Sequence, residues 1–302
     1  MEKIQAALAK ARAEREGLDP LAPSQERVAA QTTATKVAAA RAQAHGAPQP
    51  VAAAAPAAPS VSSAQITENW QALTPCVPKA GVLRRNRVIG LESGPESTTV
   101  DVMRTKILHQ MRAHGWKRLA ITSPSANCGK STLTTNLAFS LARQPDLRTI
   151  VCDMDFRRPT LSNILGLREP CDFSKVLSGE STFQDEAVRP RPNLAFGLTA
   201  TKIRNSAELL QSPDVGPALD KIAEDYAPDL MIFDTPAMFA SDHTMAFVHH
   251  VDCVLLIAAA GQSTVREIDI CETDMAQQTN IMGVILNKCR YMEKDYSYGG
   301  GY

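Results

Sequence analysis

The chain has 302 residues, of which 44% are hydrophobic, and its 32 Lys and Arg side chains balance its 32 Asp and Glu side chains. This length leaves room for one large domain or two ordinary ones. A net charge of zero creates no overall field that would draw the protein to nucleic acid or to an anionic membrane, so the composition argues against a nucleic-acid-binding protein. The charged N-terminus lacks the apolar core of a signal peptide, and the apolar run at 254–260 is too short to span a membrane, so we expect a cytoplasmic protein.

The first part of the chain differs from the rest in composition. Apolar residues recur at helical spacing within 1–17, which predicts a short amphipathic helix. Residues 18–85 are rich in Ala, Pro, Gln, Ser and Thr, and so few large apolar residues bury too little surface to offset chain entropy. We therefore expect a disordered linker over 18–85, a globular domain over 86–290 and a separate tail over 291–302.

The domain alternates short β-rich runs with helical stretches. The expected strands are RLAIT, TIVCD, NLAFGLT, DLMIFD, VDCVLLIA and IMGVILN, and a long helix begins at Lys130. Continuous apolar strands separated by helices predict an α/β fold with a doubly wound, mostly parallel sheet covered on both faces. Ligands bind at the carboxyl ends of strands in such sheets, so the residues that follow each strand are the candidates for chemistry.

The segment SPSANCGKST follows the first of these strands and opens the long helix, as a phosphate-binding loop does. Gly129 lets the backbone approach phosphates, and the amides of the loop, including Asn127 and Cys128, supply donors. Lys130 is placed to neutralise the β- and γ-phosphates, Ser131 to bind Mg²⁺ and Thr132 to hold the α-phosphate. Asn127 stands where glycine is common, and asparagine tolerates left-handed geometry. The pattern predicts binding of ATP with Mg²⁺.

Acidic residues end two later strands. Asp153 and Asp155 close TIVCDMD, and Asp234 closes DLMIFD. A buried carboxylate is costly unless it meets a cation, and a magnesium nucleotide supplies one. Asn287 ends the last strand, where it would either contact a nucleotide base or form a turn.

The C-terminal tail holds four of the five tyrosines, Tyr291, Tyr296, Tyr298 and Tyr302, in a glycine-rich segment. Such a segment offers no packing reason for aromatic side chains. Phenol hydroxyls on a tail that can reach an active site are suited to be phosphoacceptors.

Taken together, these segments resemble the bacterial tyrosine kinases of capsule and exopolysaccharide assembly, in their stand-alone cytoplasmic form, over residues 95–302. SPSANCGKST is similar to the family's Walker A loop, IVCDMDFRRP to its second acidic motif and LMIFDTPA to its Walker B strand; NSAELL, the Ser241–Asp242 pair and GVILNK are similar to other family segments. The family's oligomerisation helix is matched by VDVMRTKI only at Arg104 and Thr105, which leaves a homo-oligomer open.

The resemblance implies an ATP-dependent tyrosine autokinase that regulates polysaccharide polymerisation and export. It implies roles in ATP binding, Mg²⁺ binding and catalysis for Lys130, Ser131, Asp153, Asp155 and Asp234, and phosphate acceptance for the tail tyrosines. It also implies partners: a membrane chain-length regulator that activates the kinase and recruits it to the inner membrane face, and a cognate phosphatase.

Three points stay open at this level. Asp153 is either the general base for the tyrosine hydroxyl or a ligand of Mg²⁺. A partition or positioning ATPase is a rival interpretation, although such proteins carry a second lysine where this chain has Ser125. A non-catalytic nucleotide-binding scaffold is another.

Overall fold

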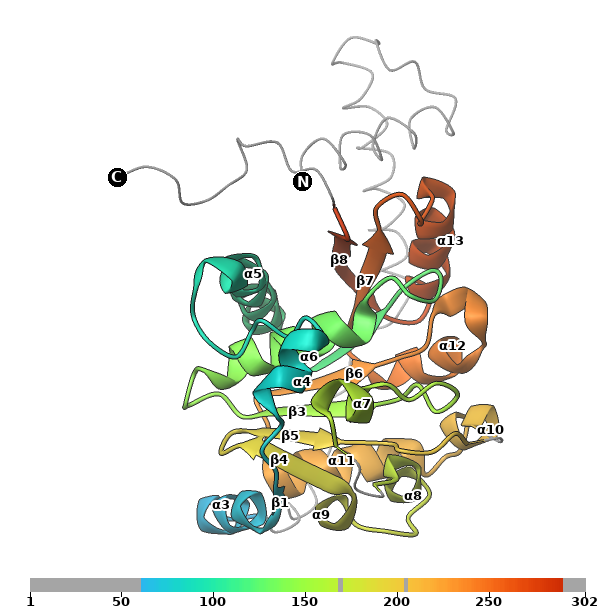
Figure 1. Ribbon diagram of the computed structural model, residues 1–302. Coiled ribbons are helices and arrows are strands. Elements are labelled where there is room, and N and C mark those ends of the chain that lie inside the picture. The colour runs from blue at the N-terminus through green and yellow to red at the C-terminus, as the bar shows by residue number, and fades with distance from the viewer. Residues whose placement is uncertain (1–60, 168–170, 204–205, 290–302) are drawn as a thin grey trace, which may run out of the picture. The chain divides into compact units, whose positions relative to one another are not determined.

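The computed structural model describes residues 61–167, 171–203 and 206–289 (Figure 1). The predicted helix over 1–17, the part of the linker up to residue 60 and the tyrosine tail lie outside the described residues. Within the described ranges, no helix is long and apolar enough to cross a membrane.

Eight strands form one sheet in the order β1-β4-β5-β3-β6-β2-β7-β8. Their bounds are β1 Thr74–Pro75, β2 Arg118–Thr122, β3 Thr149–Asp153, β4 Ala187–Arg191, β5 Leu194–Gly197, β6 Leu230–Asp234, β7 Cys253–Ala259 and β8 Asn280–Asn287. All neighbouring pairs are parallel except β4 and β5, which form a hairpin. The predicted doubly wound, mostly parallel sheet is therefore confirmed.

Helices connect these strands and cover both faces of the sheet. The α-helices are α3 Ser63–Ala72, α4 Ala80–Arg85, α5 Thr98–His114, α6 Lys130–Ala142, α7 Leu161–Leu165, α8 Phe173–Leu177, α9 Phe183–Glu186, α10 Ser206–Leu210, α11 Val215–Tyr226, α12 His243–Phe247 and α13 Val265–Met275. Short 3-10 turns are η1 Pro95–Ser97, η2 Met238–Ala240 and η3 Val248–His250.

Two apolar cores lie on the two faces of the sheet. Successive residues of a strand alternate between them: Leu119 and Ile121 of β2 pack with α4, α5, α6 and α7, whereas Ala120 packs with α3, α8, α11, α12 and α13. This alternation follows from the two-residue period of a strand. Both faces are buried, which explains why the strand sequences are continuously apolar.

Residues 61–85 correct the predicted linker, because they form α3, β1 and α4. Trp70 is 3% exposed, and its indole N–H donates to the carbonyl oxygen of Tyr226 over 2.7 Å. The Tyr226 ring packs edge-on against the indole. The average composition of 18–85 did not indicate an ordered segment. A few large side chains are enough to order residues 61–85, because α11 offers an apolar surface against which they pack.

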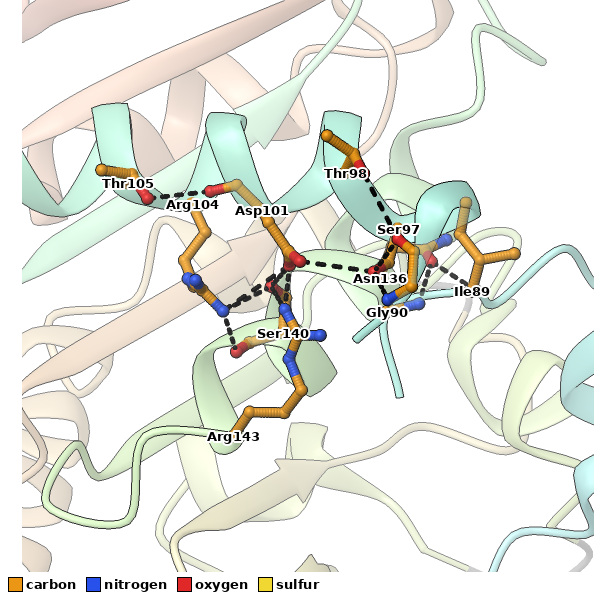
Figure 2. A network of polar contacts seen from close by, with 11 residues as sticks. Ile89, Gly90, Ser97, Thr98, Asp101, Arg104, Thr105, Asn136, Ser140 and Arg143 are labelled. Carbon is orange, nitrogen blue, oxygen red and sulfur yellow. Dashed lines mark hydrogen bonds and ion pairs between the residues drawn. The ribbon is translucent and has the colours of Figure 1, made fainter. Parts of the chain in front are cut away.

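A polar network joins α5 to α6 (Figure 2). The Oδ1 atom of Asp101 accepts hydrogen bonds from Ser140 Oγ over 2.7 Å and from Arg143 Nη2. Arg104 lies 3.6 Å from the same oxygen and donates to the carbonyl oxygen of Ser140 over 3.0 Å. Arg104, which matches the family's oligomerisation helix, is thus engaged within its own chain.

Asn136 of α6 extends this network to the segment before α5 (Figure 2). Its Oδ1 accepts from the backbone N–H groups of Ile89 and Gly90 over 2.7 and 2.9 Å, and its Nδ2 donates to the carbonyl oxygen of Arg87 over 3.0 Å. A side chain at position 90 would lie 2.2 Å from the Asn136 carbonyl oxygen, which explains the glycine. The network holds α6, whose first residue is Lys130, against the body of the domain.

Candidate nucleotide site

The loop between β2 and α6 has the backbone geometry that its sequence predicts. Asn127 and Gly129 both adopt left-handed φ values, 64° and 94°. The first confirms that asparagine replaces a glycine here without loss of the loop conformation, because asparagine visits this region more readily than most residues. Gly129 also has no room for a side chain, since a Cβ at this position would lie 2.4 Å from Asn287 Nδ2.

Carbonyl groups of this loop are held by residues from the far edge of the sheet. Asn287 Nδ2 donates to the Cys128 carbonyl oxygen over 2.9 Å, and Lys288 Nζ donates to that of Asn127. Gln262 Nε2 donates to the Ala126 carbonyl oxygen over 2.8 Å. Asn287 therefore supports the loop from the end of β8. Sequence reasoning assigned no role to Lys288, although it ends the segment GVILNK, and missed Gln262, which belongs to no motif.

Asp153 and Asp234 end the neighbouring strands β3 and β6 and are paired in register. Both are fully buried. Burial raises the pKa of Asp153 well above its ordinary value, and the adjacent Asp234 and Asp155 charges raise it further. Burial also raises the pKa of Asp234 to about 6, although Lys130 and hydrogen bonds from Ser131 and Thr134 favour its charged form.

These two carboxylates fit a cation. Asp153 Oδ2 and Asp234 Oδ2 are buried without a hydrogen-bond partner, which is costly for adjacent acids in a dry interior. The part of the chain that the structure describes has no group of three or more His, Cys, Asp or Glu side chains placed to hold a metal. Mg²⁺ needs no such group, because it usually binds one or two carboxylates together with phosphates and waters. Asp153, Asp234 and the Ser131 hydroxyl are a donor set of this kind.

A cavity of about 1050 Å³ opens beside the loop. Asn127, Gly129, Lys130, Ser131, Thr132 and Asp155 line it, together with residues from α10, α12 and the segments after β3 and β6. Asp153, Asp234, Cys128 and Asn287 are not among its lining residues. The predicted loop and acids are thus brought together: Asp155 lines the cavity, and the buried Asp153 and Asp234 end the neighbouring strands β3 and β6, of which β6 pairs with β2.

The turn after β3 places Asp155 and two arginines at this cavity. Asp155 Oδ1 accepts from the backbone N–H of Arg158 over 3.0 Å, and burial raises the pKa of Asp155. Arg157 Nη1 donates to the Ala240 carbonyl oxygen over 3.3 Å. Both arginine side chains are exposed and line the cavity, so they lie where an anionic ligand would be bound.

His243 is a cavity residue that the sequence did not single out. It begins α12, directly after the Ser241–Asp242 pair, and is 4% exposed. Burial lowers the pKa of its imidazole. The preceding Ser241–Asp242 pair was the sequence feature that could have drawn attention to His243. A single histidine cannot be told from a core residue by sequence alone.

Residues 119–296 match the family described as the CobQ/CobB/MinD/ParA nucleotide binding domain. A putative tyrosine-protein kinase EpsB from Ralstonia nicotianae is 26% identical over 210 residues, which cover 69% of this chain and 28% of that protein. A putative tyrosine-protein kinase CapB from Staphylococcus aureus is 28% identical over 200 residues, covering 65% of this chain and 85% of that protein. The chain therefore spans under a third of EpsB but most of CapB.

A similar solved structure is the kinase domain of the Escherichia coli tyrosine kinase ETK. It superposes with a TM-score of 0.58 at 28% identity, covering 67% of this chain and 80% of that one. The resemblance to bacterial tyrosine kinases expected from the sequence is confirmed by these relatives.

Proposed function

This chain belongs to the CobQ/CobB/MinD/ParA nucleotide-binding family, and from that premise we propose that it is an ATP-dependent protein tyrosine autokinase. It transfers the γ-phosphate of ATP to its own tail tyrosines, Tyr291, Tyr296, Tyr298 and Tyr302. One observation carries this proposal: a phosphate loop with Lys130 lies beside two buried carboxylates that each keep an unpartnered oxygen. The names of the relatives support the choice of tyrosine as acceptor.

In this proposal the loop binds the triphosphate. Its backbone amides, the start of α6 and the Lys130 ammonium carry positive charge to the phosphates, and Thr132 holds the α-phosphate. Ser131, Asp234 and Asp153 hold Mg²⁺, which neutralises charge on the phosphate oxygens when bound. Most of the rate acceleration in phosphoryl transfer comes from such positioning and charge stabilisation.

Two roles were considered for Asp153. It is fully buried beside Asp234, and each carboxylate keeps an unpartnered oxygen, which supports a shared Mg²⁺. We therefore propose Asp153 as a ligand of Mg²⁺, and the general base for the tyrosine hydroxyl stays the alternative role. Asp155, which lines the cavity in electrostatic contact with Lys130, is the acid placed beside the transferring group.

We further propose a cellular setting by analogy with the relatives. The kinase acts in the cytoplasm on capsule or exopolysaccharide assembly, is activated and recruited to the membrane by a chain-length regulator, and is reset by a phosphatase. A homo-oligomer is part of this setting, although Arg104 donates to Ser140 within its own chain.

The test is mass mapping of phosphate after incubation of the purified chain with Mg²⁺ and ATP. The wild type is expected to gain phosphotyrosine in the tail, whereas Lys130→Met gains none, because the loop loses the cation that faces the phosphates. Lys175→Met, which changes an exposed lysine of α8, is the matched control and should label like the wild type. ATP hydrolysis without phosphotyrosine would favour the positioning-ATPase alternative, and nucleotide binding without turnover would favour a scaffold.

A further inference from the structure

Three polar atoms of residues that line the cavity are buried without a hydrogen-bond partner. They are Thr160 Oγ1, Ser241 Oγ and His243 Nδ1, and all three residues line the cavity. They come from the segments after β3 and after β6, not from the phosphate loop. Buried polar atoms in native proteins are nearly always satisfied by protein, water or ligand, so these three atoms require polar partners within the cavity.

The hydrogen bonds around His243 define which of its nitrogens is the acceptor. Ser206 Oγ donates its only proton to the carbonyl oxygen of Ile203 over 3.2 Å. The same Oγ lies 3.4 Å from His243 Nε2, so we assign the imidazole proton to that nitrogen, which then donates to Ser206. Nδ1 is then left as a lone-pair acceptor. Burial favours this neutral imidazole, with Asp242, Arg157, Asp155 and Glu208 as the charged groups around it.

The missing partner is therefore a hydrogen-bond donor. A phosphate oxygen only accepts at neutral pH, so it leaves Nδ1 unsatisfied, whereas a hydroxyl donates to Nδ1 and can accept from Ser241 or Thr160. The cavity, at about 1050 Å³, is at the upper limit of the roughly 300–1,000 Å³ of small-molecule sites.

We propose that Thr160, Ser241 and His243 form the acceptor subsite, in which His243 Nδ1 receives a hydrogen bond from the hydroxyl of a tail tyrosine. The identity of the ligand rests on the proposed kinase function; the need for a hydroxyl donor does not. The subsite would select tyrosine over phenylalanine and orient the hydroxyl beside the phosphate loop.

Binding of peptides tests this without any phosphate transfer. The full chain, with its four tail tyrosines changed to phenylalanine to limit competition, is titrated with the peptide of residues 290–302 in the presence of Mg²⁺ and ADP. The same peptide with phenylalanine at all four positions is the comparison. We expect the tyrosine peptide to bind about tenfold more tightly, as one buried neutral hydrogen bond implies.

Two variants of His243 separate this role from a structural one. In His243→Asn the amide oxygen can take the place of Nδ1, so the tyrosine preference should persist. In His243→Gln the amide reaches toward Ser206 instead, so the ratio of the affinities for the tyrosine and phenylalanine peptides should fall to about one. Nucleotide affinity and thermal stability should stay close to those of the reference chain. His109→Asn, at an exposed position of α5, is the control and should leave the preference unchanged.

The proposal is overturned if the reference chain binds both peptides equally or binds neither, as it would if a water molecule satisfied Nδ1. It is equally overturned if His243→Gln keeps the preference. Its failure can be told apart from failure of the kinase proposal. If the chain forms phosphotyrosine but binds both peptides equally, only the acceptor subsite is refuted. If it prefers the tyrosine peptide but forms no phosphotyrosine, only the autokinase proposal is refuted.

Discussion

Replacing Asp101 by alanine should destabilise the domain strongly, although this residue is remote from the phosphate loop. Asp101 is 22% exposed in its side chain and accepts from Ser140 and Arg143 through one oxygen. Arg143 already has two buried nitrogens, Nε and Nη1, without partners, so removing the carboxylate leaves its guanidinium poorly satisfied. A hydrogen bond to a charged group contributes about 1.5–3 kcal/mol.

Partial solvent access reduces that contribution, and loss of an acid from the first turn of α5 adds roughly 0.5 kcal/mol. We expect the free energy of unfolding to fall by about 2–3 kcal/mol, which corresponds to a Tm about 4–12 °C lower for a domain of this size. Urea unfolding measures the first quantity and calorimetry the second. Asp146→Ala, at an exposed turn position, is the control and should change the free energy by less than about 0.5 kcal/mol.

A double-mutant cycle with Arg143→Ala isolates the pair itself. A coupling energy of about 1 kcal/mol or more is expected for groups in direct contact within one network. A loss below about 0.5 kcal/mol for Asp101→Ala, or the absence of coupling to Arg143, would refute the inference that this network fastens α5 to α6.

Two further changes test the site and the N-terminal packing. Since the pKa of Asp234 rises from its ordinary 3.8 to about 6, the folded chain binds this proton more tightly than the unfolded chain, so stability falls as pH rises through that window and stays low above it. Asp234→Asn should therefore raise the Tm of the metal-free protein at pH 7.5 and abolish the further rise caused by Mg²⁺ with ATP; a lower Tm in scanning fluorimetry would contradict this. Trp70→Ala should cost about 3–5 kcal/mol in urea unfolding, because it empties a buried site and leaves the Tyr226 carbonyl unpaired. An unchanged midpoint would mean that α3 is not part of the folded domain.

Features that depend on neighbouring residues in the chain could be predicted from the sequence. The strand–loop–helix order around Gly129 and Lys130, and the left-handed position of Asn127, follow from local backbone preferences. The acids at the ends of β3 and β6 followed equally, because parallel strands bring their carboxyl ends to one edge. Local chemistry therefore determined the nucleotide site and the fold class.

Only the tertiary structure decided what depends on the surroundings of each side chain. Asn287 supports the loop because β8 ends beside Cys128, Trp70 is buried because α11 lies beside α3, and Asp153 is fully buried beside Asp234. The role of His243 depends on which of its nitrogens finds a partner, and that partner, Ser206, is 37 residues away in sequence. Burial and long-range hydrogen bonds arise from packing between distant segments, and no local pattern encodes them.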